Sequence, residues 1–409
     1  MFMRVMAYEF TGEAQSRLER YVGRIGDVLH NKRRKASFAT YFLGLLGDGE
    51  RKSVEPIAAR AAGEPEQTRA VTEQLLHFLV DSEWDDQRVR RVAAREAIGA
   101  LMGREPMDCW IIDDTGFLKQ GTKSPGVQRQ YTGSAGKTTN CQLAPSLTLC
   151  TRTTELPVDM DLYIPQSWAD DRERCEAARV PEELRFRAKW QIGLDLLRRA
   201  VEADYPRGVV LADCAYGDVG AFRAGVRALE LDYGLDVRAQ TRVRIVCSDG
   251  DEADTMSVAM VAEVVGARLF RRVSWREATQ RTLWSRFACV RVRVVTDTEP
   301  NGGEEQWLII DRPARDQPPK HYTLSTLPKN LSHKRLVRRL KQRWRIERTY
   351  EDLKGELGLD HFEGRTYPGW QHHVTCVLSC AAFVVAERVR AFPPSAGRSE
   401  ADRSIACAA

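Results

Sequence analysis

The sequence predicts an α/β protein in which a mixed β-sheet is flanked by helices, with an N-terminal helical region and an inserted all-β subdomain. Three observations in the 409 residues support this fold class. Residues 1–104 show helical periodicity, residues 105–240 alternate between strand and helix patterns, and residues 241–326 consist of short strand-like runs separated by turns. Helical periodicity returns in residues 327–390, and residues 391–409, which are rich in Pro, Ala and Ser, are expected to be disordered.

Residues 105–240 predict the order strand, strand, strand, helix, strand, helix, strand. The expected strands are 109–114, 142–151, 158–164, 208–213 and 233–239, and the expected helices are 183–203 and 219–229. Strand–helix–strand units pair in parallel through right-handed crossovers, while the first three strands can pair as a meander. This is the element order of a ribonuclease-H-like sheet.

The composition is that of a folded protein without membrane spans. Hydrophobic residues make up 43% of the chain and charged residues 29%. No run of about 20 uncharged apolar residues exists, and the longest candidate, residues 374–386, predicts a buried helix. The N-terminus also lacks the apolar run of a signal peptide, so we expect a cytoplasmic protein. The net charge of +5 is too small to indicate a polyanionic partner by itself.

Two of the predicted strands end in carboxylates, Asp113 and Asp213, and Asp114 follows the first of them. An acidic residue at the carboxyl end of a buried strand is common at the ligand sites of α/β proteins. Each one taken singly is equally compatible with a turn or a helix cap. Because consecutive strand residues point to opposite faces of a sheet, only one of Asp113 and Asp114 should face a shared site.

A third acidic residue, Glu347, lies in a strongly basic segment. On a helix, Arg343, Glu347 and Lys354 would fall within about 40° of one another. An ordinary salt-bridged helix face is the simplest interpretation of this spacing. However, residues 329–348 contain nine Lys or Arg residues and Glu347 as their single acid. This imbalance favours a helix whose cations bind a polyanion and whose single acid binds a metal ion.

Together these segments resemble the DDE transposases of bacterial insertion sequences, in particular the DDE-superfamily endonucleases. Arg343, Glu347 and Lys354 match the Arg-x3-Glu-x6-Lys signature of the family, and the segments around Asp113 and Asp213 resemble its first and second acidic motifs. The resemblance covers roughly residues 40–390. One departure is Leu340, which stands where the broader signature has Tyr. It puts in doubt a contact with DNA from that position but leaves the three acids intact.

The resemblance implies a DNA transposase that cuts and joins DNA at insertion-sequence ends with two Mg²⁺ ions, which Mn²⁺ could replace. Asp113, Asp213 and Glu347 would hold the ions and serve as the catalytic residues. Mg²⁺ prefers carboxylate oxygen, and two ions about 4 Å apart can activate a water molecule and stabilise the leaving oxygen of a phosphodiester. Asp113 is preferred to Asp114 because the motif tolerates Glu at the second position. Glu347 is preferred to Glu351 because it has the required spacing from the flanking cations.

The resemblance also implies that the partners are double-stranded DNA, as element ends and target, and a second copy of the chain on that DNA. The protein would be associated with the nucleoid. The cations expected to contact DNA phosphates are Arg343, Lys354, Arg345 and Lys341. Residues 1–104 are the expected DNA-binding region, although their basic cluster at residues 32–35 is equally compatible with a solvated loop.

Two alternatives to an active transposase remain. One is a catalytically inactive or domesticated relative that binds DNA without cleaving it. The presence of all three acids argues against this alternative, and Leu340 favours it slightly. The other is a structure-specific nuclease that cuts DNA without joining it.

Overall fold

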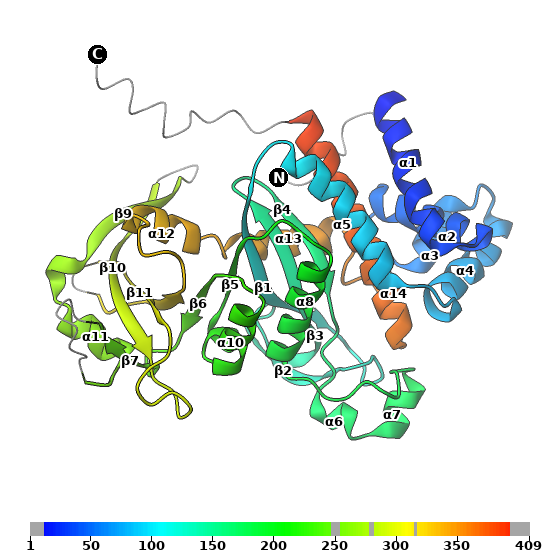
Figure 1. Ribbon diagram of the computed structural model, residues 1–409. Helices are drawn as coiled ribbons and strands as arrows, with labels where there is room; N and C mark the ends of the chain where they lie inside the picture. Colours follow the sequence, from blue (N-terminus) through cyan, green and yellow to red (C-terminus); the bar gives the residue numbers. More distant parts are fainter. Residues whose placement is uncertain (1–11, 247–253, 278–281, 315–316, 393–409) are drawn as a thin grey trace, which may run out of the picture.

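The structure, a computed structural model, describes residues 12–246, 254–277, 282–314 and 317–392. A mixed sheet occupies its centre, the N-terminal helices lie at one end, and the strands of the insertion lie at the other (Figure 1). The expected mixed sheet flanked by helices is therefore confirmed. Within the described ranges, no helix has both the length and the apolar character that crossing a membrane requires.

The N-terminal region consists of helices, as its periodicity predicts. Its five α-helices are α1 (Gly12–Leu29), α2 (Lys32–Leu46), α3 (Val54–Ala61), α4 (Thr68–Leu76) and α5 (Asp86–Met102). Buried aromatic side chains of α2, among them Phe38 and Phe42, form the centre of this bundle. The bundle packs on the long C-terminal helix α14 (Tyr367–Ala391), where Arg17 of α1 pairs with Glu387 at 2.7 Å. Residues 374–386 belong to this helix and are buried, as expected.

The central strands form the predicted ribonuclease-H-like order. They are β1 (Met107–Leu118), β3 (Lys137–Thr151), β4 (Glu155–Met160), β5 (Val209–Ala212) and β6 (Tyr233–Val237). Side by side they run β4-β3-β1-β5-β6, with β1, β5 and β6 parallel and β3 and β4 antiparallel to their neighbours. A further strand, β2 (Gln128–Thr132), pairs with the start of β3 in a segment for which the sequence analysis gives no strand.

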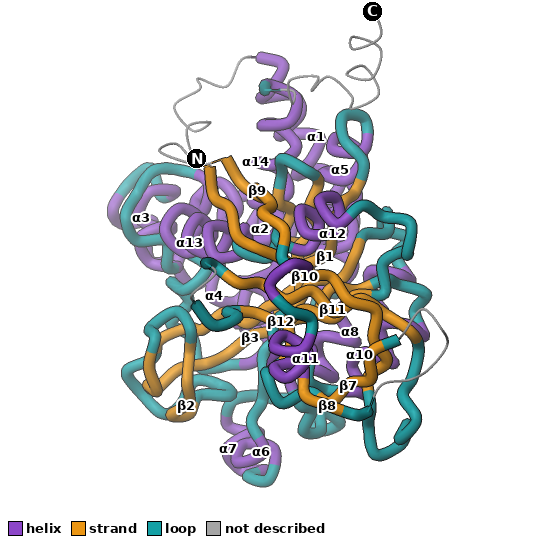
Figure 2. Tube along the Cα trace, turned by 90° about the vertical axis from the view of Figure 1, so that its left-hand side faces the viewer, coloured by secondary structure: helices purple, strands orange, loops and turns teal. Residues whose placement is uncertain are grey.

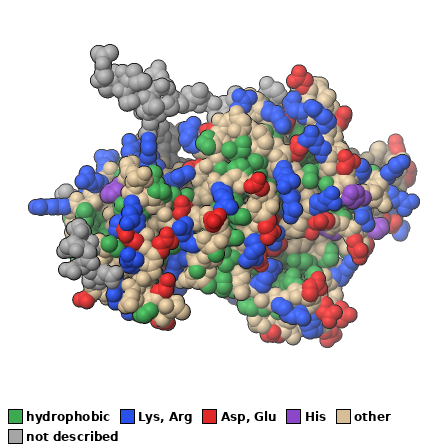
Figure 3. All heavy atoms as spheres, in the orientation of Figure 1, with side chains coloured by type: hydrophobic (Ala, Val, Ile, Leu, Met, Phe, Trp, Pro, Cys, Tyr) green, Lys and Arg blue, Asp and Glu red, His purple; other side chains and the backbone are tan. Residues whose placement is uncertain are grey.

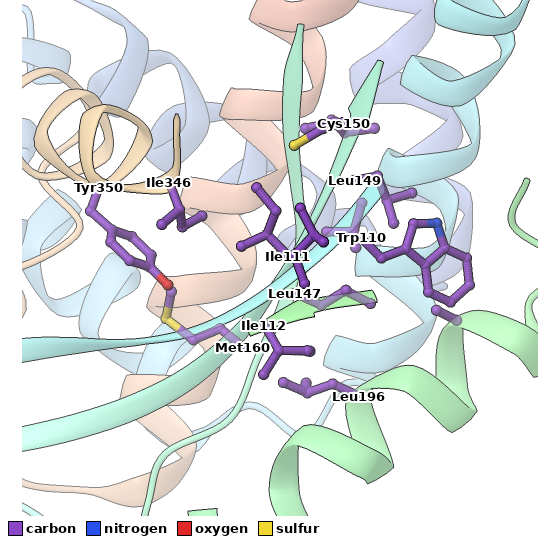
Figure 4. Close-up of a cluster of buried hydrophobic side chains, with 14 of the residues drawn as sticks. Trp110, Ile111, Ile112, Leu147, Leu149, Cys150, Met160, Leu196, Ile346 and Tyr350 are labelled. Carbon is purple, nitrogen blue, oxygen red and sulfur yellow. The ribbon is translucent and has the colours of Figure 1, made fainter. Parts of the chain in front are cut away.

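Helices cover both faces of these strands. The helices of the chain after β4 are α6 (Gln166–Ala169), α7 (Arg172–Ala177), α8 (Lys189–Glu202), α9 (Cys214–Gly217) and α10 (Gly220–Ala228). The C-terminal part supplies α12 (His333–Leu340) and α13 (Arg345–Leu357) before α14. In Figure 4, Ile111 of β1 lies on the side of Ile346 in α13, whereas Ile112 points toward Leu196 in α8. Side chains alternate along β1, so one of its faces meets α13 and the other meets α8.

The insertion extends the central sheet instead of forming a separate one. Its strands are β7 (Arg242–Ile245), β8 (Met256–Ser257), β9 (Arg271–Glu277), β10 (Thr282–Val294), β11 (Glu305–Arg312) and β12 (His321–Ser325). β12 pairs antiparallel with β6, and β11 and β10 follow, so that twelve strands share one hydrogen-bonded sheet. The insertion also contains a short helix, α11 (Val258–Val264), beside β7 and β8 (Figure 2). The expectation of an all-β insertion is corrected here, because the insertion contains this helix. Ser257 is its N-cap and accepts the N–H of Met260 at 3.2 Å.

The expectation that Arg343, Glu347 and Lys354 share one helix is also corrected, because the chain breaks into α12 and α13 at residues 341–344. The two helices pack on different parts of the sheet: α12 contacts β9 of the insertion, and α13 contacts β1 and β4. The chain changes direction between them. Arg343 therefore lies in the connecting turn and not on a shared helix face with Glu347 and Lys354.

Candidate active site

Asp113 and Asp213 lie side by side at the end of the sheet where the parallel pairing of β1 with β5 stops. We call this end of the sheet the carboxylate edge. β1 and β5 are parallel neighbours, and Ile111 pairs with Leu211 in their register. Each aspartate comes two residues after its member of this pair, so the register that joins the strands also brings the two carboxylates together. Asp213 then caps α9, where its Oδ1 accepts the N–H of Ala215 at 2.9 Å.

Asp113 and Asp114 point to opposite faces of the sheet. Asp113 lies two residues after Ile111 and so shares the face of β1 that meets α13 (Figure 4), and its backbone carbonyl accepts the hydroxyl of Tyr350 at 3.2 Å. Asp114 faces α8 and α9, where it binds the ammonium group of Lys189 and accepts the hydroxyl of Tyr216. Asp113 is thus the member of the pair that shares a face with the helix carrying Glu347. Asp114 already forms an ion pair with Lys189.

Both aspartates of the edge are costly to ionise in this structure. Burial raises the pKa of Asp113 to about 7, against the attraction of Arg343, and the nearby charge of Asp213 adds to the rise. Burial also raises the pKa of Asp213, and here too the attraction of Arg343 opposes it. Carboxylate oxygens are ligands that Mg²⁺ prefers, and a bound cation would favour the ionised form of both groups. The chemistry of this pair therefore fits a divalent cation.

Arg343 provides positive charge at this edge. Its Nη1 lies 3.7 Å from Oδ2 of Asp113, and its Nε lies 3.8 Å from Oδ2 of Asp236 in β6. Burial disfavours the charged guanidinium, yet the carboxylates of Asp113, Asp236, Asp213 and Glu347 together raise the pKa of Arg343. The arginine side chain remains 30% exposed, so solvent or a ligand can reach it.

Asp236 is a residue of this edge that the sequence interpretation missed. Leu235 of β6 pairs with Ala212 of β5, which places Asp236 beside Asp213 in the strand order. The hydroxyl of Thr323 in β12 donates to Oδ1 of Asp236 at 2.6 Å. The available signal was its strand: residues 233–239 were predicted to be parallel to the strand that ends at Asp213.

Glu347 lies on α13 in an exposed position, three residues before Tyr350, which contacts β1. It is close enough to Arg343 to contribute to the raised pKa of that residue. Within the part of the chain that the structure describes, no three His, Cys, Asp or Glu side chains are grouped closely enough to hold a metal ion. The structure therefore brings Asp113 and Asp213 together, while Glu347 does not complete a group of three with them.

The other cations expected to contact DNA are engaged within the protein. The Nζ of Lys354 donates to the carbonyl of Gly116 at 2.6 Å, and burial lowers its pKa. Lys341 pairs with Asp311 at 2.5 Å. Arg345 is buried, with 4% exposure, and its guanidinium binds Glu155 and the carbonyl of Thr151. All four partners belong to strands of the sheet: Gly116 of β1, Thr151 of β3, Glu155 of β4 and Asp311 of β11.

The departure at Leu340 has a packing explanation. This side chain is 8% exposed and lies over Gly234 of β6, where an added Cβ would come within 2.0 Å of Cδ2 of Leu340. Position 340 is thus part of the contact between α12 and the sheet. Two neighbouring histidines, His372 and His373, are also buried in the fold. His372 binds the carbonyl of Leu79, and His373 binds those of Gly358 and Leu359, so both imidazoles hold parts of the fold together.

The basic cluster at residues 32–35 forms the first turn of α2 and not a loop, with Asn31 as its N-cap. Lys35 pairs with Asp27 at 2.6 Å. On the face shown in Figure 3, Lys and Arg side chains are distributed among Asp and Glu side chains instead of gathering in one basic patch.

Comparisons with known proteins identify relatives of the chain. Residues 24–282 match the family described as DDE superfamily endonuclease, and residues 188–383 match the family described as transposase DDE domain. A probable transposase for insertion sequence element IS701 from Microchaete diplosiphon is 30% identical over 213 residues. This match covers 51% of the chain and 50% of the relative, so the chain spans about half the length of that protein.

Proposed function

The chain belongs to the DDE superfamily endonucleases, and from this premise we propose that it is a transposase that cuts and joins DNA at insertion-sequence ends. The family implies nuclease activity, and transposases act on DNA. The observation that carries the proposal is the meeting of Asp113, two residues beyond the part of β1 that pairs with β5, and Asp213, which directly follows β5.

In the proposed reaction, Asp113, Asp213 and Glu347 hold two divalent cations, Mg²⁺ or Mn²⁺. When bound, these cations supply a nucleophile at neutral pH and stabilise charge on the phosphate oxygens. Asp213 enters the site with its Oδ1 already fixed by the N–H of Ala215, which limits the directions from which it can bind a cation. Glu347 is supplied by α13, whose position relative to β1 is set by the contact of Tyr350 with Asp113.

The cations of the chain position DNA in this proposal. Arg343 binds a phosphate next to the site of cleavage, because its guanidinium already lies at the carboxylate edge and is partly exposed. Lys354 and Lys341 bind flanking phosphates after exchanging their present partners. Arg345 is left out of this set, because its guanidinium is buried against Glu155 and Thr151. The N-terminal helices contribute further DNA contacts.

Two copies of the chain act together on the DNA in this proposal, since joining requires that two element ends come together. The protein acts in the cytoplasm at the nucleoid, where its DNA substrate lies. Neither the dimer nor this location is needed for the first nicking step, so cleavage can be tested separately.

A nicking assay tests the proposal. Purified full-length chain is incubated with a duplex that contains the element end, with Mg²⁺, with Mn²⁺ and with a chelator. We expect nicking with either cation and none with the chelator, and we expect Asp213→Asn to abolish it. Asp232→Asn is the matched control, because Asp232 lies just before β6, away from the carboxylate edge, and pairs with Arg227 at 2.9 Å. Equal nicking by wild type and Asp213→Asn would contradict the proposal.

One observation favours a second candidate, a relative that binds DNA without cutting it. Arg343 already supplies positive charge to Asp113 and Asp236, and the described side chains contain no group of three metal-binding residues. Retardation of the duplex in a gel, without nicking under Mg²⁺ or Mn²⁺, would select this candidate.

A further inference from the structure

Three successive parallel strands each contribute an aspartate to the same end of the sheet: Asp113 after the part of β1 that pairs with β5, Asp213 after β5, and Asp236 in β6. Arg343 is shared between the outer two. Its distances of 3.7 Å and 3.8 Å to Asp113 and Asp236 are both longer than a hydrogen bond, so the guanidinium is committed to neither carboxylate. Asp113 and Asp236 form ion pairs with it, and Asp213 and Glu347 add weaker attraction, so its position is a balance among several carboxylates.

We propose that Asp236 is a positioning residue that holds Arg343 when a divalent cation takes Asp113. This proposal rests on the proposed function, because it assigns a cation to Asp113. A cation at that carboxylate repels the guanidinium, which then needs another partner close by. Asp236 is such a partner, and it keeps Arg343 at the edge of the site, where a DNA phosphate can bind it.

Asp236 is held in place for this role by the insertion. The hydroxyl of Thr323 in β12 donates to its Oδ1, which leaves Oδ2, the atom nearest to Arg343, available for the guanidinium. β12 and β6 are paired strands, with Thr323 opposite Asp236 in their register. The side chain of Asp236 is 27% exposed, so its attraction for Arg343 is only partly screened by water.

The same strand provides a matched control. Asp232, just before β6, also accepts a threonine hydroxyl, that of Thr326 at 3.0 Å, and also pairs with an arginine, Arg227 at 2.9 Å. It thus reproduces the chemistry of Asp236 at the opposite end of the strand, away from the carboxylate edge. Any general effect of removing a paired aspartate from β6 appears in both variants.

A double-mutant cycle on Mn²⁺ binding tests the proposal. Mn²⁺ is titrated into the DNA-free full-length chain and followed by electron paramagnetic resonance, for wild type, Asp236→Asn, Arg343→Gln and the double variant. Without Asp236 the guanidinium competes more strongly for Asp113, so Asp236→Asn should weaken Mn²⁺ binding about three- to fivefold. In the Arg343→Gln background the competitor is absent, and the same change should alter the affinity by less than about twofold. Asp232→Asn should leave the affinity unchanged.

The outcomes of this cycle distinguish a role of Asp236 through Arg343 from a direct effect of Asp236 on the metal ion. If Asp236→Asn weakens Mn²⁺ binding equally in both backgrounds, Asp236 acts on the metal without Arg343, and the proposal is overturned. An unchanged affinity of Asp236→Asn in the wild-type background also overturns it, as does an absence of Mn²⁺ binding by the wild type. The nicking assay gives an independent result: a coupled cycle with no nicking would refute the proposed function and leave the role of Asp236 standing.

Discussion

The raised pKa of Asp113 predicts that this residue destabilises the folded protein at neutral and alkaline pH. Its carboxyl has an ordinary pKa of 3.8 and a folded-state pKa of about 7, so between these values the folded chain binds a proton that the unfolded chain has lost. The contribution of this carboxyl to the free energy of unfolding is fully present below pH 3.8 and is lost as the pH rises through 7. Asp113→Asn removes the ionisation and should therefore stabilise the protein, increasingly so as the pH rises.

The size of the effect follows from the shift. About three pKa units at about 1.4 kcal/mol each set an upper limit of about 4 kcal/mol at pH 8. The side chain of Asp113 is 17% exposed, so solvent screening reduces this, and we expect Asp113→Asn to raise the free energy of unfolding by about 2 kcal/mol at pH 8. At pH 5, where the wild-type carboxyl is mostly protonated when folded, the gain should be less than half as large.

Urea denaturation in the absence of divalent cations, at pH 5 and pH 8, measures both values. Asp232→Asn is the control and should give no gain at either pH, because its carboxylate is paired with Arg227. A variant Asp113→Asn that is no more stable than wild type at pH 8 would refute the reasoning. So would a gain of the same size at both pH values. Added Mg²⁺ should shrink the difference at pH 8, because only the wild type retains the carboxylate.

Three further predictions concern other parts of the structure. Arg90→Ala removes one of the two arginines that bind the buried Asp159, at 2.9 Å, and leaves the other, Arg199, in place at 2.8 Å. The variant should cost about 2–3 kcal/mol of unfolding free energy, measured by urea denaturation, and a loss below about 1 kcal/mol would contradict this. Gly217→Ala places a Cβ within 1.9 Å of the carbonyl oxygen of Asp236 and should lower the free energy of unfolding by about 1–3 kcal/mol. The readout is a lowered melting temperature, and an unchanged melting temperature would show that β6 can shift freely. Arg343→Gln removes one phosphate contact, so the slope of log affinity for duplex DNA against log salt should fall in magnitude by about 1, and an unchanged slope would place Arg343 away from DNA.

The strand order of the central sheet could be predicted from the sequence, because its signals are local. Short apolar runs ending at Asp113 and Asp213, separated by periodic helices, define parallel strands whose ends must meet. The preference for Asp113 over Asp114 came from the resemblance to the family and stays a prediction; in the structure Asp113 lies on the face of β1 that meets α13. The alternation of side chains along a strand made clear that only one of the two could face the site.

The parts that could not be predicted depend on tertiary contacts. The break between α12 and α13 arises because Leu340 packs over Gly234 while Tyr350 packs on β1, and helical periodicity contains no information about either partner. The burial of Arg345 is hidden for the same reason, since its partner Glu155 is distant in the sequence. Asp236 was missed because a single acid inside an apolar strand becomes informative only when the register with β5 is known.

The pairing of β12 with β6 has a consequence for the solubility of the chain. Without the insertion, β6 would be the last strand of the sheet, and its unpaired N–H and C=O groups would be open to strands of other molecules. β12 saturates these groups along four register pairs, from Val237 opposite Tyr322 to Gly234 opposite Ser325. The insertion therefore covers β6, and a shortened chain that ends at β6 would expose this strand to pairing with further copies.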